Sequence, residues 1–235
     1  MSYSKFAYYY DSLMDDEFYD RYEEFILNHA KFDSVLELGC GTGLMAIKLS
    51  SLNKTVYATD LSPEMLEVAK YNASEANVDL MLGKIDMCDF QINEPVDLIL
   101  CMCDSLNYIH KEKKVKRVFT NVYEALSDEG TFIFDVHSLH KIDVTFKNYV
   151  EENKDEDFYF KWTVNKEGEG KIHHHVIIDD FENDDHVDED HYQQTYSVES
   201  YKTWLKEAGF KHIELYSDFK EYNDQDDRVL FVVKK

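Results

Sequence analysis

Three glycines stand close together in a chain that has only eight, and carboxylic acids flank them. Gly39, Gly41 and Gly43 follow a short apolar run that contains Glu37, and Asp60 closes the next apolar run. Glycines at a strand-to-helix turn let a ligand lie against bare backbone. A carboxylate at the end of the second strand can accept hydrogen bonds from both hydroxyls of a ribose. The spacing therefore predicts a site for a ligand that contains a nucleoside.

The spacing of these glycines also separates two kinds of nucleotide ligand. Dinucleotide sites favour Gly-x-Gly-x-x-Gly, whose last glycine allows close packing of helix on strand. Here the motif is Gly-x-Gly-x-Gly, and Leu44 occupies the position of that last glycine. A buried Glu37 carboxylate would disfavour a pyrophosphate and suit a cation such as an ammonium or a sulfonium. An NAD(P)-dependent oxidoreductase and a purely structural turn are the alternatives.

The elements around the glycines alternate between strands and helices. Strands are expected at residues 34–38, 55–59, 79–82, 96–102 and 130–135, with amphipathic helices between them. Ser62 and Pro63 give one helix an N-cap and a first-turn proline. This order predicts a doubly wound, mostly parallel sheet with helices on both faces. A helix between Ser197 and Gly209, then strands at residues 212–216 and 229–233, complete a seven-stranded α/β fold.

The pattern changes after Val136. Residues 158–164, 171–181 and 191–196 are expected to form three antiparallel strands, with a solvated acidic turn at residues 179–190. The chain has no internal repeat and no linker rich in glycine, serine or proline. We therefore expect one domain over residues 1–235, in which residues 136–196 form a small β insertion that covers the substrate pocket as a lid.

Four segments resemble the class I S-adenosylmethionine-dependent methyltransferases. They are residues 37–43 (ELGCGTG), 58–65 (ATDLSPEM), 86–87 (DM) and 97–101 (DLILC). The resemblance covers about the first 135 residues and, more loosely, the last two strands. It implies a Rossmann-like methyltransferase fold and S-adenosyl-L-methionine as the cofactor.

The resemblance also implies which residues hold that cofactor. The glycine loop would face its methionine part, Asp60 its ribose and Leu61 its adenine, while Asp86 and Met87 would contact the polar edge of adenine. The Cys101 carbonyl would accept a hydrogen bond from the methionine amino group. The set expected at the cofactor is Tyr10, Glu37, Gly39, Cys40, Gly41, Gly43, Asp60, Leu61, Met65, Asp86, Met87 and Cys101. Tyr10 belongs to it if the aromatic run at residues 6–11 is a flap rather than an amphipathic helix packed on the sheet.

Three further motifs are similar to a bacterial, YqeM-like branch of these methyltransferases. They are residues 10–14 (YDSLM), 134–138 (FDVHS) and 189–196 (EDHYQQTY). Members of this branch often carry an arginine where the present chain has Gln194.

Methyl transfer by in-line displacement requires aligned reactants, exclusion of water and a nucleophile with a free lone pair. Candidate residues follow the fourth and fifth strands. We expect His137 to be the general base, with Tyr108 as a second catalytic candidate. Asp104, Asn107 and His175 are expected to contact a small-molecule acceptor. The alternative for His137 is a histidine hydrogen-bonded to hold its loop.

Composition narrows the partners. The 235 residues include 25 Lys and Arg against 48 Asp and Glu, a net charge of −23 that disfavours nucleic acid. No run approaches the roughly 18 apolar residues of a membrane span, and the acidic N-terminus is unlike a signal peptide, so a cytoplasmic protein is expected. No metal site is expected, because His173 and His175 share a strand face without further ligands. A module that binds the cofactor without turnover remains an alternative, and the sequence leaves the oligomeric state open.

Overall fold

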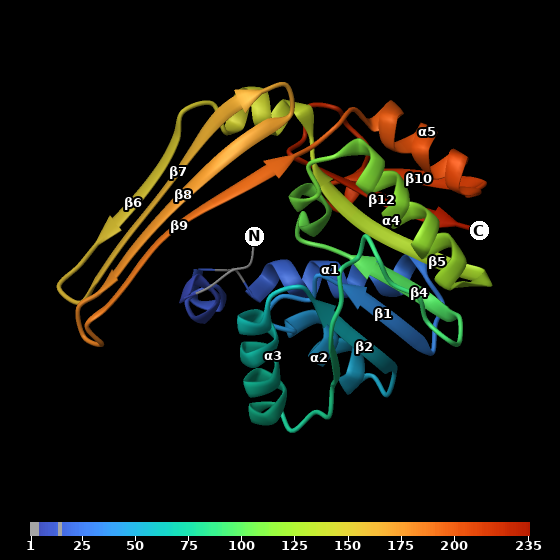
Figure 1. Cartoon of the computed structure of the whole chain (residues 1–235), viewed down its shortest axis with the longest axis horizontal. Coiled ribbons are helices and arrows are strands. Elements are labelled where there is room, and N and C mark those ends of the chain that lie inside the picture. Colours follow the sequence, from blue (N-terminus) through green and yellow to red (C-terminus); the bar gives the residue numbers. More distant parts are fainter. Residues whose placement is uncertain (1–4, 14–15) are drawn as a thin grey trace.

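The computed structural model describes residues 5–13 and 16–235, so Met14 of the YDSLM motif lies outside the described residues. The main sheet contains β1 Ser34–Leu38, β2 Thr55–Asp60, β3 Met81–Lys84, β4 Val96–Cys101, β5 Leu126–His137, β10 His212–Ser217, β11 Lys220–Glu221 and β12 Arg228–Lys234. Their order is β11-β10-β12-β5-β4-β1-β2-β3 (Figure 1). The first five strands run parallel, and β12 is antiparallel to both β5 and β10.

This arrangement confirms the doubly wound, mostly parallel sheet. The seven expected strands are all present, and the two-residue β11 adds an eighth at one edge. The third strand starts two residues later than expected, at Met81, and the fifth already begins at Leu126. Short strands at an edge carry a weak hydrophobic pattern, which explains the shift of β3.

Helices cover both faces of the main sheet. On one face lie α1 Asp16–His29, α2 Leu44–Ser51 and, beside α2, α3 Pro63–Glu75. On the other face lie α4 Glu112–Ala125 and α5 Val198–Ala208 (Figure 1). The expected caps are present: the Ser62 hydroxyl accepts a hydrogen bond from the Met65 N–H (3.2 Å), and Gly209 ends α5 at a φ of 115°. In the described part of the chain, no helix is both long enough and apolar enough to span a lipid bilayer.

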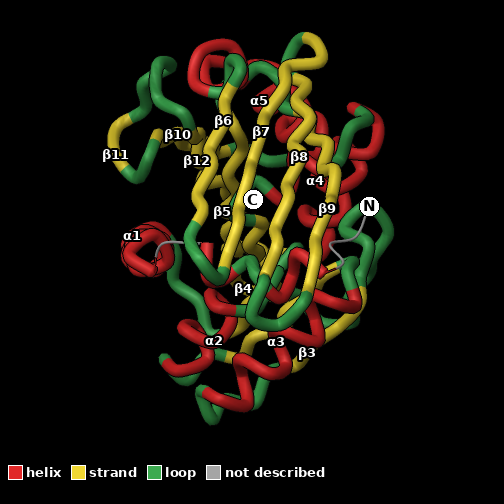
Figure 2. Tube along the Cα trace, turned by 90° about the vertical axis from the view of Figure 1, so that its left-hand side faces the viewer, coloured by secondary structure: helices red, strands yellow, loops and turns green. Residues whose placement is uncertain are grey.

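The segment between β5 and α5 forms a second, antiparallel sheet of four strands. They are β6 Tyr149–Lys154, β7 Phe158–Gly168, β8 Lys171–Asp180 and β9 Asp185–Gln194. Figure 2 views this sheet from its broad side, with strands of the main sheet behind it. The three-strand expectation was wrong in two respects: β6 was missed, and most of the acidic stretch at residues 179–190 belongs to β8 and β9. Only residues 181–184 form the turn.

The chain order of the strands sets the place of the site. After β1 the chain adds β2 and β3 on one side, and then returns to add β4 and β5 on the other. Ligands of doubly wound sheets bind at the carboxyl ends of the strands where the order reverses in this way. The glycine turn follows β1 at that point, and residue 102 and those after it follow β4.

Candidate active site

The glycine turn brings backbone close to two neighbouring elements. Gly39 has a φ of +72°, and a Cβ atom on it would stand 2.8 Å from the Cβ of Ser105. Gly43 has a φ of +79°, and a Cβ there would lie 3.0 Å from the Cβ of Ala69 in α3. Both positions therefore require glycine, for conformation and for space. Gly39 faces the end of β4, whereas Gly43 permits close packing against α3.

Two buried carboxyl groups flank this turn. Glu37 is 3% exposed, and burial, with the Asp60 charge second, raises its pKa to about 8. Its Oε2 atom has no hydrogen-bond partner among the described residues. Asp60 accepts hydrogen bonds from the N–H groups of Gly41 (3.0 Å) and Ser62 (2.8 Å), and burial raises its pKa as well. A buried carboxyl oxygen without a partner, close to the Asp60 carboxylate, favours a ligand with a cationic group, because that charge would let Glu37 release its proton.

A cavity of about 170 Å³ lies at the turn, and we call it the glycine-turn cavity. Most residues expected at the cofactor line it: Tyr10, Glu37, Gly39, Cys40, Gly41, Asp60, Leu61, Met65, Asp86 and Met87. Two expected residues do not line it: Cys101 is fully buried within β4, and Gly43 packs on α3. The contact expected of Cys101 would be made by its backbone carbonyl, and it stays a prediction.

Some lining residues of this cavity were missed by sequence reasoning. Tyr19 comes from α1, Ser105 follows β4, and Tyr192 comes from β9. Ser105 donates a hydrogen bond to the Met102 carbonyl (2.8 Å) and a longer one to the Gly39 carbonyl (3.3 Å). Its place four residues after the end of β4, which lies beside the turn, was a usable signal. Tyr19 and Tyr192 reach the cavity through tertiary packing, and no motif marks them.

The N-terminal segment, residues 5–13, is fixed to the glycine turn. It forms two short 3-10 turns, Lys5–Tyr8 and Asp11–Leu13. The Asp11 carboxylate accepts hydrogen bonds from the Thr42 hydroxyl (2.6 Å) and from the Asn72 amide of α3 (2.8 Å). Tyr10 lines the cavity, and burial raises the pKa of its phenol well above 10. The segment thus has the position expected of a flap, although it is not one continuous helix.

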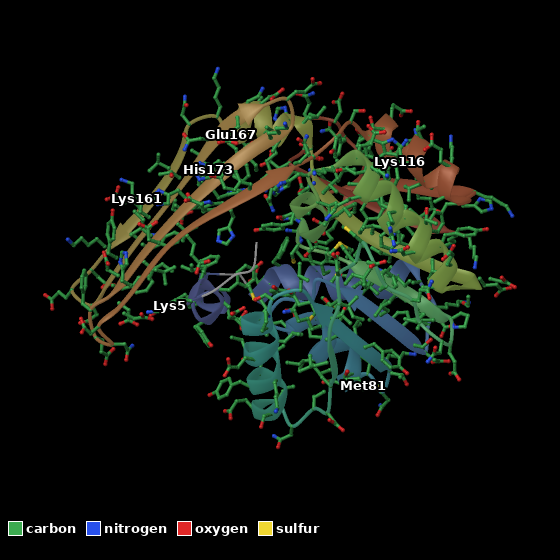
Figure 3. All side chains as sticks on the ribbon, in the orientation of Figure 1. Lys5, Met81, Lys116, Lys161, Glu167 and His173 are labelled. Atoms are coloured by element: carbon green, nitrogen blue, oxygen red, sulfur yellow. The ribbon has the colours of Figure 1, made fainter. Side chains whose placement is uncertain are left out.

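The same segment also contacts the far end of the second sheet. The Tyr9 hydroxyl donates to Asp180 and Asp185, at 3.2 Å each, and Lys5 forms an ion pair with Asp185. Figure 3 marks Lys5 at this junction, with Lys161 and His173 on the second sheet. Nine residues therefore join α3, the glycine turn and the β8–β9 hairpin.

A second cavity, of about 260 Å³, is bounded by the N-terminal segment, by residues that follow β4 and β5, and by one face of the second sheet. We call it the inter-sheet cavity. Tyr10, Cys103 and Tyr108 line both cavities, which therefore adjoin. Of the residues expected on the acceptor side, Asp104, Tyr108 and His137 line it. Aromatic rings form much of its wall: Phe6, Phe18, Phe146, Phe160 and Trp162.

Two residues expected to contact the acceptor lie elsewhere. His175 points to the outer face of β8, where its Nε2 atom lies 2.8 Å from Asp188 Oδ1, and the buried His174 lines the cavity instead. Asn107 is fully buried; its Oδ1 accepts from the His137 N–H (2.9 Å), and its amide donates to the Gln194 carbonyl (3.1 Å). Asn107 therefore holds the end of β5 in place. The Gln194 side chain donates to the Glu169 and Thr195 carbonyls and lines neither cavity among the described residues.

A chain of hydrogen bonds fixes His137 in the inter-sheet cavity. The Trp162 indole N–H donates to His174 Nδ1 (3.0 Å), so the His174 proton is on Nε2. The side-chain oxygen of Gln193, Oε1, accepts hydrogen bonds from Nε2 of both His174 (2.9 Å) and His137 (3.0 Å). The Gln193 amide donates to Asp104 (2.6 Å), which fixes its orientation. The His137 Nδ1 atom then carries a lone pair, and it has no hydrogen-bond partner in the described part of the chain.

His137 and His174, the two histidines joined through Gln193, are neutral at pH 7. Burial lowers the pKa of His137 well below 6.5, and the positive charges of Lys141 and Arg228 act in the same direction. Burial also lowers the pKa of His174, to about 4. Asp104 Oδ2 lies 3.5 Å from His137 Nε2, so a carboxylate is in place to stabilise the imidazolium if His137 takes up a proton.

Arg228, from β12, was not identified from the sequence. Its guanidinium forms an ion pair with the fully buried Asp135, lies 3.6 Å from Asp104 and donates to the Tyr22 hydroxyl (3.1 Å). The negative charges of Asp135 and Asp104 keep the guanidinium charged despite burial. This ion pair holds the ends of β5 and β12 together beside the cavity.

Comparisons with known proteins agree with this geometry. The family model described as "Methyltransferase domain" matches residues 35–130. "Putative methyltransferase GWCH70_2453" of Geobacillus sp. (strain WCH70) is 34% identical and is aligned over 100% of both chains. "Putative methyltransferase YqeM" of Bacillus subtilis (strain 168) is 33% identical over 100% of this chain and 98% of that protein. A crystal structure of an S-adenosylmethionine-dependent methyltransferase from Clostridium acetobutylicum has a TM-score of 0.86 at 28% identity, with 98% and 97% coverage.

The fold and the glycine-turn site define a class I S-adenosylmethionine-dependent methyltransferase. Within this class, the chain belongs to the methyltransferase family that includes the two bacterial relatives. S-adenosyl-L-methionine is its cofactor. The oxidoreductase alternative from the glycine spacing is therefore set aside.

Proposed function

We propose that this enzyme transfers a methyl group from S-adenosyl-L-methionine to a small-molecule acceptor by in-line displacement. The observation that supports this most strongly is the common wall of the two cavities, formed by Tyr10, Cys103 and Tyr108. A cofactor in the glycine-turn cavity and an acceptor in the inter-sheet cavity would meet at this wall. A cavity of about 260 Å³ suits a small-molecule acceptor. A net charge of −23 disfavours a nucleic-acid acceptor. The enzyme would act in the cytoplasm.

The residues of the glycine-turn cavity fit the cofactor. The unsatisfied Glu37 oxygen offers a partner to a cationic group, and the bare backbone at Gly41, where a Cβ would meet nothing closer than Met65 Sδ at 4.0 Å, leaves no side chain in the way. Asp60 holds the turn through Gly41 and would bind the ribose, with Leu61, Asp86 and Met87 around the adenine. When bound, the cofactor supplies an electrophilic methyl group on a sulfonium.

His137 would accept the proton of the acceptor at Nδ1. Its Nε2–H is committed to Gln193, so Nδ1 holds the lone pair, and the depressed pKa keeps it unprotonated at pH 7. After proton uptake the imidazolium would be stabilised by Asp104. Tyr108, at the common wall, would orient the acceptor toward the cofactor cavity.

The second sheet and the N-terminal segment would together exclude water. Residues 136–196 would act as a lid over the acceptor within a single domain of residues 1–235. Support comes from the aromatic side chains that β7 and the N-terminal segment contribute to the cavity wall. Exclusion of water protects the sulfonium from side reactions and strengthens electrostatic contacts.

Two measurements on the purified protein test this proposal. Calorimetry with S-adenosylhomocysteine should show binding that Asp60→Ala weakens at least about tenfold, or 1.4 kcal/mol. Asp89→Ala, which removes only an exposed ion pair with Arg117, should bind like the wild type. When the purified protein is incubated with S-adenosylmethionine and the small-molecule fraction of a bacterial extract, it should form S-adenosylhomocysteine.

Each failure has its own meaning. Absent cofactor binding, or unchanged binding in Asp60→Ala, would contradict the assigned site. Product release only with the macromolecular fraction would contradict a small-molecule acceptor. Cofactor binding with no product from any fraction would identify a binding module without turnover.

A further inference from the structure

The inter-sheet cavity contains a lysine whose ammonium group has no anionic partner. Lys141 begins a short π-helical turn, Lys141–Thr145, after β5, and it lines the cavity. Its Nζ atom lies 4.7 Å from the centre of the Phe146 ring, and among the described residues it makes no ion pair or hydrogen bond. Burial lowers the pKa of Lys141, and the Arg228 charge acts in the same direction, whereas the charges of Asp104, Asp227 and Asp135 oppose this without forming an ion pair with Nζ. Three N–H donors that line a cavity without an acceptor favour an anionic ligand.

The other charges at this cavity already have partners. Arg228 is paired with Asp135 and Asp104. Glu151 accepts a hydrogen bond from the Tyr149 hydroxyl (2.8 Å), and His137 and His174 are neutral. His191, which also lines the cavity, has its Nε2 atom 3.5 Å from a Glu189 carboxylate oxygen. In the part of the cavity wall that the structure describes, Lys141 is therefore the cation left for a ligand.

We propose that the methyl acceptor is a small monocarboxylic acid with a flat apolar body and a separate hydroxyl or amine, and that Lys141 binds its carboxylate. The hydroxyl or amine would form the new bond to the methyl group as the bond from the methyl to sulfur breaks, leaving S-adenosylhomocysteine, and its proton would pass to His137. This inference rests on the proposed function, whose acceptor site it specifies. Phe146, Phe160 and Trp162 supply ring faces and edges suited to a planar body. One ammonium matches one carboxylate, whereas a phosphate dianion would meet a single free cation and the Glu151 carboxylate on the same wall.

The position of Lys141 couples acceptor binding to His137. The Phe146 ring contacts both residues: its centre is 5.6 Å from that of the His137 ring and 4.7 Å from Lys141 Nζ. The Lys141 charge contributes to the low pKa of His137. A carboxylate on Lys141 would offset this charge and raise the pKa of His137. The acceptor would thereby strengthen the base that receives its proton.

Fluorine NMR with two matched probes tests the carboxylate site. The wild-type protein should bind meta-fluorobenzoate at least about tenfold more tightly than the neutral meta-fluorobenzamide. Lys141→Met should abolish the preference, and Lys141→Arg should restore part of it. Lys166→Met is the matched control, since it removes an exposed ion pair to Asp143 of the same turn and should keep the preference. Equal binding of acid and amide, binding of neither, or a wild-type preference in Lys141→Met would overturn the proposal.

A second readout does not depend on any acceptor. The pKa of His137, followed by NMR of its ring, should rise in Lys141→Met and stay unchanged in Lys166→Met. An unchanged value in Lys141→Met would contradict the coupling, and thermal unfolding of each variant would confirm that it is folded. Calorimetry with S-adenosylhomocysteine on the same preparations keeps the two proposals apart: lost cofactor binding speaks against the proposed function, whereas lost carboxylate preference with intact cofactor binding speaks against this one.

Discussion

Glu37 retains a proton in the folded chain over a range of pH in which the unfolded chain has lost it. Its pKa rises from 4.5 to about 8 on burial. Because the folded state binds this proton more tightly, the contribution of Glu37 to the free energy of unfolding is greatest below pH 4.5 and falls as the pH rises toward 8. The contribution of this group falls by up to roughly 1.4 kcal/mol per pH unit. We expect Glu37→Gln to remove this component.

Urea unfolding at a series of pH values measures the effect. Glu37→Gln should gain stability relative to the wild type as the pH rises from 4.5 toward 8. Glu75→Gln, at the exposed end of α3, should follow the wild-type curve. If the Glu37→Gln curve also runs parallel to that of the wild type, the carboxyl group is not protonated in the folded state.

Substitutions at His137 and at His175 test the catalytic role proposed for His137. His137→Gln removes the unpaired Nδ1 and should lower kcat roughly 100-fold or more, with cofactor affinity unchanged. Because its pKa lies well below 6.5, the wild-type rate should be constant near neutrality and fall only in acid. His175→Gln, on the outer face, should retain the wild-type rate. The rates are measured with the acceptor identified from the extract. If the wild type, His137→Gln and His175→Gln have equal rates, His137 is not the base and only holds its loop.

The histidines also show what a sequence leaves undetermined at this scale. Strand alternation predicts that His173 and His175 share one face, and the structure places both in hydrogen-bond contact with carboxylates, those of Asp190 and Asp188. Alternation cannot say which face is inward. The partner strand decides that: Val164 pairs with His174, and Trp162 on the same face donates to it.

At the scale of elements, two glycine substitutions, one in the glycine turn and one in β3, test the close packing of the turn. Gly39→Ala would place a Cβ atom 2.8 Å from Ser105 at a left-handed φ. We expect it to destabilise the protein by about 1–3 kcal/mol and to abolish cofactor binding. Gly83→Ala, in β3, would place its nearest contact at an ordinary 3.7 Å and should change neither property. Thermal unfolding and calorimetry measure both, and cofactor binding by Gly39→Ala at wild-type affinity would contradict the close approach inferred at this turn.

Strand ends in the parallel sheet were predictable, whereas the second sheet was not fully so. Buried parallel strands are short apolar runs that end at glycine or acidic residues, and β1 and β2 show this clearly. Strand β6 is largely exposed and charged, so it has no apolar alternation. Strand β9 alternates buried Val187, His191 and Gln193 with acidic residues, and the acidic residues obscured the pattern.

At the scale of the whole molecule, the two sheets meet around a site that neither completes alone. The glycine turn and Glu37 belong to the main sheet, whereas Trp162, His174 and Gln193 come from the second sheet. Residues far apart in sequence converge here through tertiary packing, which local patterns do not encode. The N-terminal segment bridges the two parts through Asp11 at one end of its contacts and Tyr9 at the other.

This bridge should transmit cofactor binding to the second sheet. Asp11 accepts hydrogen bonds from Thr42 beside the cofactor cavity and from Asn72, so ordering of the turn by a ligand should stabilise the segment and the β8–β9 hairpin that it contacts. Hydrogen exchange should slow in residues 5–13 and in β8 and β9 when S-adenosylhomocysteine is added. In Asp11→Ala the slowing should disappear from β8 and β9, whereas Ser12→Ala, which removes only an exposed bond to the Tyr9 carbonyl, should behave like the wild type. Equal slowing of β8 and β9 in both variants would show that the sheets respond to the cofactor by another route.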